Sequence, residues 1–245
     1  MRVALALFVT FSFILVVAGN YYFFFGNAEN SIRERVVVSR VIDGDTVELE
    51  DGRTIRLLNI NTPEKNEPFS TLSKEYLALL VNRSIEIEIT GKEKYGRDLG
   101  RIYAPEYVNL VLVEEGYASP FLVSESEKKE FREAMNMAFE NEEGIWNRST
   151  FYGCIEAEIN KKEEYVIISS NCPTNIKEWV IKDESRKRYI LNGLESKEFV
   201  LYSGKGSDNA TARYWNQQDV WNNDADSIFI RDAGGNLVYF YSYGY

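Results

Sequence analysis

The sequence contains no histidine and only two cysteines among its 245 residues. The absence of histidine excludes a Ser-His-Asp triad, a Cys-His dyad and any histidine-ligated metal, and two cysteines are too few for a Cys-rich zinc site. Acid–base chemistry therefore has to come from Asp, Glu, Lys, Tyr, Arg or bound water. Any metal has to be a hard cation held by oxygen ligands.

Positive charge is also scarce, with 28 Lys and Arg against 38 Asp and Glu and a net charge of −10. This balance argues against general nucleic-acid binding, because non-specific affinity comes mostly from the neutralisation of phosphates. A small basic cleft can still exist on an acidic protein. The hydrophobic content of 44% and the aromatic content of 14% indicate a folded chain of one large domain or two small ones.

Residues 1–30 have the pattern of a targeting segment. Only Arg2 is charged before Glu29, and the almost wholly apolar run from Val3 to Gly19 is followed by aromatic residues 21–25. An apolar run of about 20 residues crosses a bilayer, and aromatic residues suit its interface. A cleaved signal peptide and an uncleaved membrane anchor both fit, and the long run with its weak cleavage site favours the anchor. A buried core helix is the less specific alternative.

Either form of the targeting segment predicts that the rest of the chain lies outside the cytoplasm, anchored or secreted. Cys154 and Cys172 stand close together in the sequence and predict a disulfide formed in an oxidising compartment, with two free buried thiols as the alternative. Asn82, Asn147 and Asn209 begin Asn-x-Ser/Thr motifs and are candidate glycosylation sites, although such motifs often arise by chance.

The remainder divides into residues 31–150 and residues 151–245, with a boundary near residues 146–152. In the first part, β-branched and alternating segments predict five strands, over residues 35–42, 46–50, 53–60, 85–89 and 99–103. Helical patterns cover residues 70–81, 108–115 and 125–142. The first of these helices is expected to bury Leu72, Tyr76, Leu79 and Leu80. Five short strands with interspersed helices predict a closed barrel of the oligonucleotide-binding type.

The second part, residues 151–245, contains short strand-like segments separated by Asn-Gly and Gly-rich turns. These segments are residues 155–159, 165–169, 179–181, 198–202, 227–230 and 237–243. Regular short strands without a strong helix predict a β-sandwich. The predicted fold class is therefore mainly β with some α, a barrel followed by a sandwich.

Four short motifs in the first part carry side chains that can bind a ligand or take part in catalysis. They are Asp43-Gly44-Asp45-Thr46, Arg56-Leu57-Leu58, Asn61-Thr62-Pro63-Glu64 and Lys94-Tyr95-Gly96-Arg97. Taken singly, each is more often a turn, a loop or a solvated strand face. Their joint order between well-patterned strands is what indicates a site.

The oxygens of Asp45 and Asn61 suit a hard cation, and Asp43 is positioned to support them. Glu64 can activate a water molecule. Two arginines, Arg56 and Arg97, can hold a phosphate by bidentate hydrogen bonds. A cation, a carboxylate and two arginines are the parts needed to hydrolyse a phosphodiester, and none of them is a histidine.

These motifs, together with Gly144-Ile145-Trp146, resemble the staphylococcal-nuclease-like (thermonuclease) family over roughly residues 35–148. The resemblance implies an oligonucleotide-binding-type barrel with three helices and calcium-dependent cleavage of DNA and RNA. It implies that Asp45 ligates calcium with its side chain and Thr62 with its backbone carbonyl. Glu64 falls on the carboxylate usually assigned as the general base.

The resemblance also assigns residues that hold the substrate. These are the phosphate-binding Arg56 and Arg97, and Lys94 and Tyr95 near the far phosphate of the nucleotide. Two departures matter. Residues 119–123 stand where the family often places tyrosines that stack on the base, and only Phe121 there offers an aromatic face. Asn61 stands where the family has a second calcium-ligating aspartate. An amide oxygen can still ligate calcium, but one negative charge is missing and a weaker site is expected.

Residues 153–243 resemble a lamin tail domain, which has an immunoglobulin-like β-sandwich. The motifs that carry this resemblance are Glu164-Tyr165-Val166-Ile167-Ile168, Trp179-Val180-Ile181-Lys182-Asp183 and the late run from Tyr214 to Val238. No catalytic constellation is visible in them. The resemblance implies a binding or tethering role with no defined ligand.

The sequence therefore predicts an extracytoplasmic calcium-dependent nuclease that acts on DNA, RNA or both, attached to the membrane if the N-terminal segment is uncleaved. The alternative is a catalytically weak or inactive surface module that binds nucleic acid or protein. A weaker alternative is a structural envelope protein in which the sandwich dominates. Retention of Asp45, Glu64, Arg56 and Arg97 favours the enzyme, because a pure binding module does not need all four.

Overall fold

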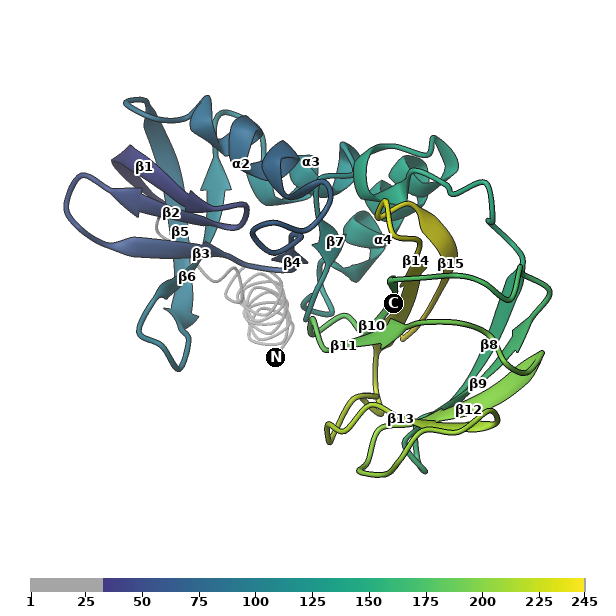
Figure 1. Ribbon diagram of the computed structural model, residues 1–245. Coiled ribbons are helices and arrows are strands. Elements are labelled where there is room, and N and C mark those ends of the chain that lie inside the picture. Colours follow the sequence, from purple (N-terminus) through teal and green to yellow (C-terminus); the bar gives the residue numbers. More distant parts are fainter. Residues whose placement is uncertain (1–32, 245) are drawn as a thin grey trace, which may run out of the picture. The chain divides into compact units, whose positions relative to one another are not determined.

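A computed structural model describes residues 33–244, so the predicted targeting segment 1–30 lies outside the described residues. From Glu34 onward the chain forms one compact unit that contains a closed β-barrel and then two further four-stranded sheets (Figure 1). Within residues 33–244, no helix is long and apolar enough to cross a membrane.

The barrel closes in the strand order β1-β2-β3-β6-β5. Its strands are β1 (Glu34–Asp43), β2 (Thr46–Leu49), β3 (Thr54–Leu57), β5 (Ser84–Lys92) and β6 (Asp98–Tyr103). β3 and β6 run parallel, and the other neighbouring strands are antiparallel. Alternating residues such as Ile85 and Ile87 point into the barrel and are buried, as the period of a half-buried strand requires. A short pair, β4 (Ile60–Asn61) with β7 (Ser119–Pro120), adds a small second sheet.

Within residues 33–244, three α-helices accompany the barrel. They are α2 (Ser70–Ala78), α3 (Val108–Glu114) and α4 (Lys128–Glu140), and a 3-10 turn, η1 (Gly144–Trp146), follows them. α2 packs beside β1, and α3 packs against α4. The predicted buried face of the first helix was partly wrong, because Leu79 is 63% exposed and Leu77 is fully buried instead.

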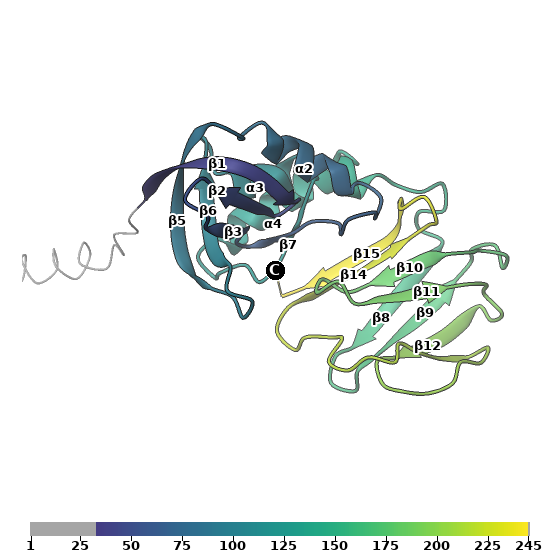
Figure 2. The ribbon, with the colours of Figure 1, turned by 60° about the vertical axis from the view of Figure 1, so that its left-hand side comes forward.

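The C-terminal part is built from two four-stranded sheets that lie face to face (Figure 2). One sheet has the order β11-β10-β14-β15, with β10 (Trp179–Lys182), β11 (Arg188–Leu191), β14 (Asp226–Arg231) and β15 (Leu237–Tyr243). The other has the order β13-β12-β9-β8, with β8 (Ile155–Asn160), β9 (Tyr165–Ser170), β12 (Glu198–Tyr202) and β13 (Ala212–Tyr214). The barrel with three helices and the sandwich confirm the predicted fold class, and β11 and β13 are strands that the sequence did not predict.

A disulfide links two segments within the sandwich, and a buried tryptophan links the sandwich to the barrel. Cys154, just before β8, and Cys172, just after β9, form the predicted disulfide. Trp146 is fully buried, with ring centroids 4.9 Å from Phe240 and 5.9 Å from Phe229. Because these two phenylalanines belong to β14 and β15, the apolar core of the barrel continues into the sandwich sheet.

The three candidate glycosylation sites, Asn82, Asn147 and Asn209, are all exposed. The side chain of Asn147 donates to Asn236 at 2.7 Å, and that of Asn209 accepts from the backbone of Thr211 and Ala212. Glycosylation at these positions stays a prediction.

Candidate active site

The first motif, Asp43-Gly44-Asp45, forms the tight turn between β1 and β2. Asp43 accepts a hydrogen bond from the backbone N–H of Gly44 at 2.8 Å, which fixes the turn. A Cβ on Gly44 would lie 2.7 Å from the Thr62 hydroxyl and 2.2 Å from that of Ser73. Glycine therefore lets the turn approach the Thr62 segment closely, and the side chain of Asp45 is only 3% exposed there.

Strand register brings the two predicted phosphate-binding arginines to Asp45. Thr46, the residue after Asp45, pairs with Arg56 across β2 and β3. The parallel pairing of β3 with β6 brings Arg97, the residue before β6, to the same end of the barrel. Arg56 forms an ion pair with Asp45 at 3.1 Å. Arg97 donates to the Thr46 hydroxyl at 3.2 Å, and that hydroxyl donates to Asp45 at 2.9 Å.

The short strand β4 supplies Asn61, and Thr62 directly follows it. Asn61 is buried and its Oδ1 accepts a hydrogen bond from Arg56 Nη2 at 2.6 Å. Arg56 also donates to the backbone carbonyls of Leu57 and Ile60, which anchors its guanidinium. Thr62 is buried next to Asn61, and its hydroxyl lies 3.4 Å from Asp45 Oδ2.

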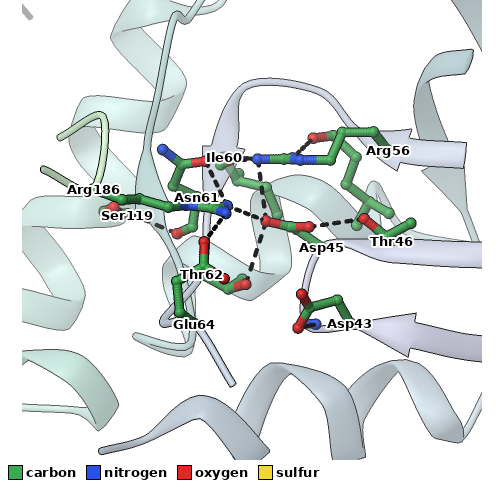
Figure 3. A network of polar contacts seen from close by, with 12 residues as sticks. Asp43, Asp45, Thr46, Arg56, Ile60, Asn61, Thr62, Glu64, Ser119 and Arg186 are labelled. Atoms are coloured by element: carbon green, nitrogen blue, oxygen red, sulfur yellow. Dashed lines mark hydrogen bonds and ion pairs between the residues drawn. The ribbon is translucent and has the colours of Figure 1, made fainter. Parts of the chain in front are cut away.

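Glu64 and Arg186 complete the network (Figure 3). Glu64 is the accessible carboxylate, with 44% of its side chain exposed against 3% for Asp45. Arg186 lies between β10 and β11 and donates to Asp45 Oδ2 at 2.5 Å and to Asn61 Oδ1 at 2.9 Å. Its other terminal nitrogen pairs with Glu64. One guanidinium from the sandwich therefore contacts three side chains of the barrel.

The surroundings shift the pKa values of Arg56 and Arg97 in opposite directions. Burial lowers the pKa of Arg56, and the neighbouring carboxylate of Asp45 partly restores it. The hydrogen bond from Arg97 to Glu93 raises the pKa of Arg97 and lowers that of Glu93. Guanidinium groups remain protonated at neutral pH, so the site presents fixed positive charge.

A family model described as staphylococcal nuclease homologue matches residues 54–148. A relative from Methanocaldococcus jannaschii, an uncharacterized protein, is 32% identical over 147 residues, which cover 46% of this chain and 71% of that protein. The chain belongs to the staphylococcal-nuclease-like family.

Two other relatives carry nuclease names. An uncharacterized endonuclease of Escherichia coli O157:H7 is 39% identical over 83 residues, which cover 32% of this chain and 53% of that protein. A micrococcal nuclease of Shigella flexneri is 36% identical over 96 residues, which cover 33% of this chain and 55% of that protein. The chain thus spans about half the length of these two curated relatives.

The staphylococcal-nuclease-like barrel brings together most of the side chains that the sequence singled out. The connected ones are Asp45, Arg56, Asn61, Thr62, Glu64 and Arg97. Lys94 and Tyr95 lie instead in the exposed turn between β5 and β6, where the Lys94 ammonium sits 4.9 Å above the Tyr95 ring. Within residues 33–244 the network forms without these two residues, and Asp43 holds its own turn rather than contacting Asn61.

The side-chain oxygens of Asp45 and Asn61 at the centre of the network suit calcium in kind. Within the described residues no three Asp, Glu, His or Cys side chains converge in a metal-like group. The oxygens of Asp45 and Asn61 are both contacted by Arg56 and Arg186. A calcium ion would therefore compete with guanidinium groups for these oxygens.

Arg186 is the member of this network that the sequence did not single out. It stands in a turn rich in charge, from Lys182 to Arg188, between one predicted strand and one unpredicted strand. The charge run marks this turn in the sequence but does not show that it contacts the barrel. The residue also lines a cavity of about 430 Å³ whose wall includes Asn61, Thr62 and Lys182.

Proposed function

We propose that this chain is a nuclease that hydrolyses phosphodiester bonds of DNA, RNA or both. The observation that carries this proposal is the polar network that joins Asp45 and Asn61 to Arg56 and Arg97, with Glu64 connected to it through Arg186. The nuclease names of the relatives from Escherichia coli and Shigella flexneri support the same reaction.

Glu64 has the accessibility that a general base needs. Its carboxylate is 44% exposed, so it can reach a water molecule once its pairing with Arg186 is released. Glu64 takes a proton from that water as its oxygen attacks phosphorus in line, and the P–O5′ bond opposite breaks. The 5′ oxygen leaves as an alcohol with a proton from solvent. Asp45 is too deeply buried, at 3% exposure, to serve the same purpose.

The two arginines of the barrel, Arg56 and Arg97, have different roles toward the phosphate. Arg97 is 34% exposed and can donate directly to phosphate oxygens. Arg56 is 10% exposed and fixed by carbonyl acceptors, so it contributes charge and holds Asp45 and Asn61 in place. Positive charge fixed before the reaction stabilises the charge that develops on the phosphoryl oxygens.

A calcium ion held by Asp45, Asn61 and the Thr62 carbonyl would supply further neutralisation of a non-bridging phosphate oxygen when bound. The missing charge at Asn61 makes such a site weaker than one with two aspartates. By resemblance to the family, the products would carry a 3′-phosphate.

A location outside the cytoplasm belongs to the same proposal. The Cys154–Cys172 disulfide supports it, because such bonds persist in oxidising compartments. Attachment by residues 1–30 and a binding role for the lamin-tail-like sandwich remain predictions from the sequence.

The test compares Glu64→Gln with wild type on single-stranded DNA. Loss of the base is expected to lower kcat by about 100-fold or more while KM and DNA binding change little. Glu75→Gln, at an exposed position on α2, is the matched control and should behave as wild type. Unchanged turnover in Glu64→Gln would remove Glu64 from this role.

A second candidate function is a binding module without hydrolysis. The pairing of Arg186 with both Asp45 and Glu64 favours it, because the carboxylates are then already neutralised. Binding of DNA by the wild-type chain with no cleavage at any calcium concentration would select this candidate.

A further inference from the structure

Arg186 reaches the barrel from a turn that is built to hold it. Asp183 accepts hydrogen bonds from the backbone N–H of Lys187 and from the Ser185 hydroxyl, both at 2.6 Å. Arg186 itself has a positive φ of 78°, a conformation that residues other than glycine adopt rarely. Such a backbone persists when surrounding contacts determine it, so this turn fixes the backbone of Arg186 while its long side chain keeps its own rotamer freedom.

Asn61 is matched to this turn. Its Nδ2 donates to the backbone carbonyl of Glu184 at 2.8 Å, while its Oδ1 accepts from Arg186. An aspartate at this position would turn a second acceptor toward the Glu184 carbonyl and lose that bond. The asparagine that replaces the family's aspartate therefore binds the same turn that carries Arg186.

Arg186 and a calcium ion would use the same oxygens. Arg186 Nη2 lies 2.5 Å from Asp45 Oδ2 and 2.9 Å from Asn61 Oδ1, and Arg56 Nη2 lies 3.1 Å and 2.6 Å from the same atoms. Calcium binds oxygen at about 2.3–2.6 Å. An ion bridging these oxygens cannot enter between two guanidinium groups at such distances, so one of them has to leave.

Arg186 is the group that can leave. Arg56 is 10% exposed and is anchored to the carbonyls of Leu57 and Ile60. Arg186 is 25% exposed and lines the neighbouring cavity of about 430 Å³, which gives its long side chain space to withdraw. Its departure also frees the Glu64 carboxylate.

We propose that Arg186 is an internal competitor of the catalytic cation, which closes the active site until calcium displaces it. This inference rests on the proposed function for the identity of the cation. With Arg186 inside, the carboxylates of Asp45 and Glu64 are balanced by two guanidinium groups. Calcium entry exchanges the Arg186 guanidinium for a divalent ion and uncovers Glu64.

The test is the calcium affinity of the full chain, measured by isothermal titration calorimetry with calcium chloride alone. Arg186→Gln removes the charge, keeps a polar side chain and is expected to tighten calcium binding by about tenfold or more. Arg186→Lys keeps a cation and is expected to bind calcium more weakly than Arg186→Gln. Arg188→Gln is the matched control, because Arg188 pairs with Glu67 and its affinity change should be negligible.

Each outcome separates this inference from the proposed function. Calcium binding that is equal or weaker in Arg186→Gln, with an unchanged circular dichroism spectrum, would overturn the competitor role. Absence of calcium binding in every variant would overturn it as well. Tighter binding in Arg186→Gln without DNA cleavage by any variant would uphold Arg186 as a competitor and refute the nuclease proposal.

Discussion

Replacement of Glu127 by glutamine is expected to destabilise the barrel strongly and in a pH-dependent way. Glu127 precedes α4 and its side chain is 14% exposed. It accepts hydrogen bonds from Arg101 at 2.6 Å, from Asn59 and Ser124 at 2.8 Å, and from Tyr107 at 3.1 Å. Glutamine has one acceptor oxygen in place of two, so its amide would face some of these donors.

The magnitude follows from the electrostatics of the folded state. Burial alone would raise the pKa of Glu127, but hydrogen bonds from Arg101, Ser124 and Asn59 outweigh it and lower the pKa to about 2. Relative to the ordinary value of 4.5, this difference corresponds to about 3 kcal/mol at neutral pH. Allowing for partial exposure, Glu127→Gln should lose about 2–3 kcal/mol, or about 5–10 °C in Tm.

The sign of the pH dependence is fixed because the folded-state pKa is depressed. The stabilisation by Glu127 is complete above the ordinary pKa of 4.5 and is lost as the pH falls toward about 2. Urea unfolding of both proteins should show a stability gap at about pH 7 that shrinks by about half at about pH 3. Glu125→Gln, with a side chain that is 88% exposed, serves as control. A gap that stays constant with pH would show that the loss comes from packing and refute the electrostatic reasoning.

Two further stability predictions concern the joints of the fold. Replacement of Cys154 and Cys172 by serine opens a loop with a sequence separation of 18, and a loss of about 3 kcal/mol is expected in thermal unfolding; equal Tm values with and without the disulfide would contradict it. Trp146→Ala removes a fully buried ring that packs on Phe229 and Phe240, and a loss of about 3–5 kcal/mol is expected in urea unfolding. Tyr95→Ala, at a position 74% exposed, should lose almost nothing, and an equal loss in both variants would refute the packing role of Trp146.

The barrel strands could be predicted because their signal is local. The strand periods and the turn motifs depend only on neighbouring residues. Most predicted bounds therefore lie close to those observed. The order of the motifs placed Asp45, Arg56 and Arg97 near one another because β2, β3 and β6 are neighbours in the barrel, whereas Lys94 and Tyr95 lie outside the network.

Where several residues of one type stand together, periodicity could not choose among them. In the run Leu77-Ala78-Leu79-Leu80, the pattern favoured Leu79 as a buried residue, whereas the packing of α2 on the barrel buries Leu77 and Leu80. β11 and β13 were missed because they are only four and three residues long, although each pairs with the strand that directly precedes it in the sequence.

Arg186 could not be found from the sequence because its role depends on a contact with Asn61 over 125 residues of chain. Neither the charged turn that carries it nor its positive φ identifies the barrel as its partner. The sequence predicted a weaker calcium site from Asn61 alone. The structure adds that the Asn61 amide is also a hydrogen-bond donor to the Glu184 carbonyl.

The measurement that tests the nuclease proposal most directly is cleavage of single-stranded DNA by the full wild-type chain, with calcium and with a chelator, at low salt. The acidic chain as a whole does not attract phosphate, so binding depends on the few arginines of the site. Low salt is chosen because it strengthens the contacts of these arginines with phosphates. If Asp45, Asn61 and Glu64 form a calcium-dependent hydrolytic site, cleavage should occur with calcium and stop with chelator. Intact DNA at saturating calcium, bound by a folded chain, would contradict hydrolysis by this site.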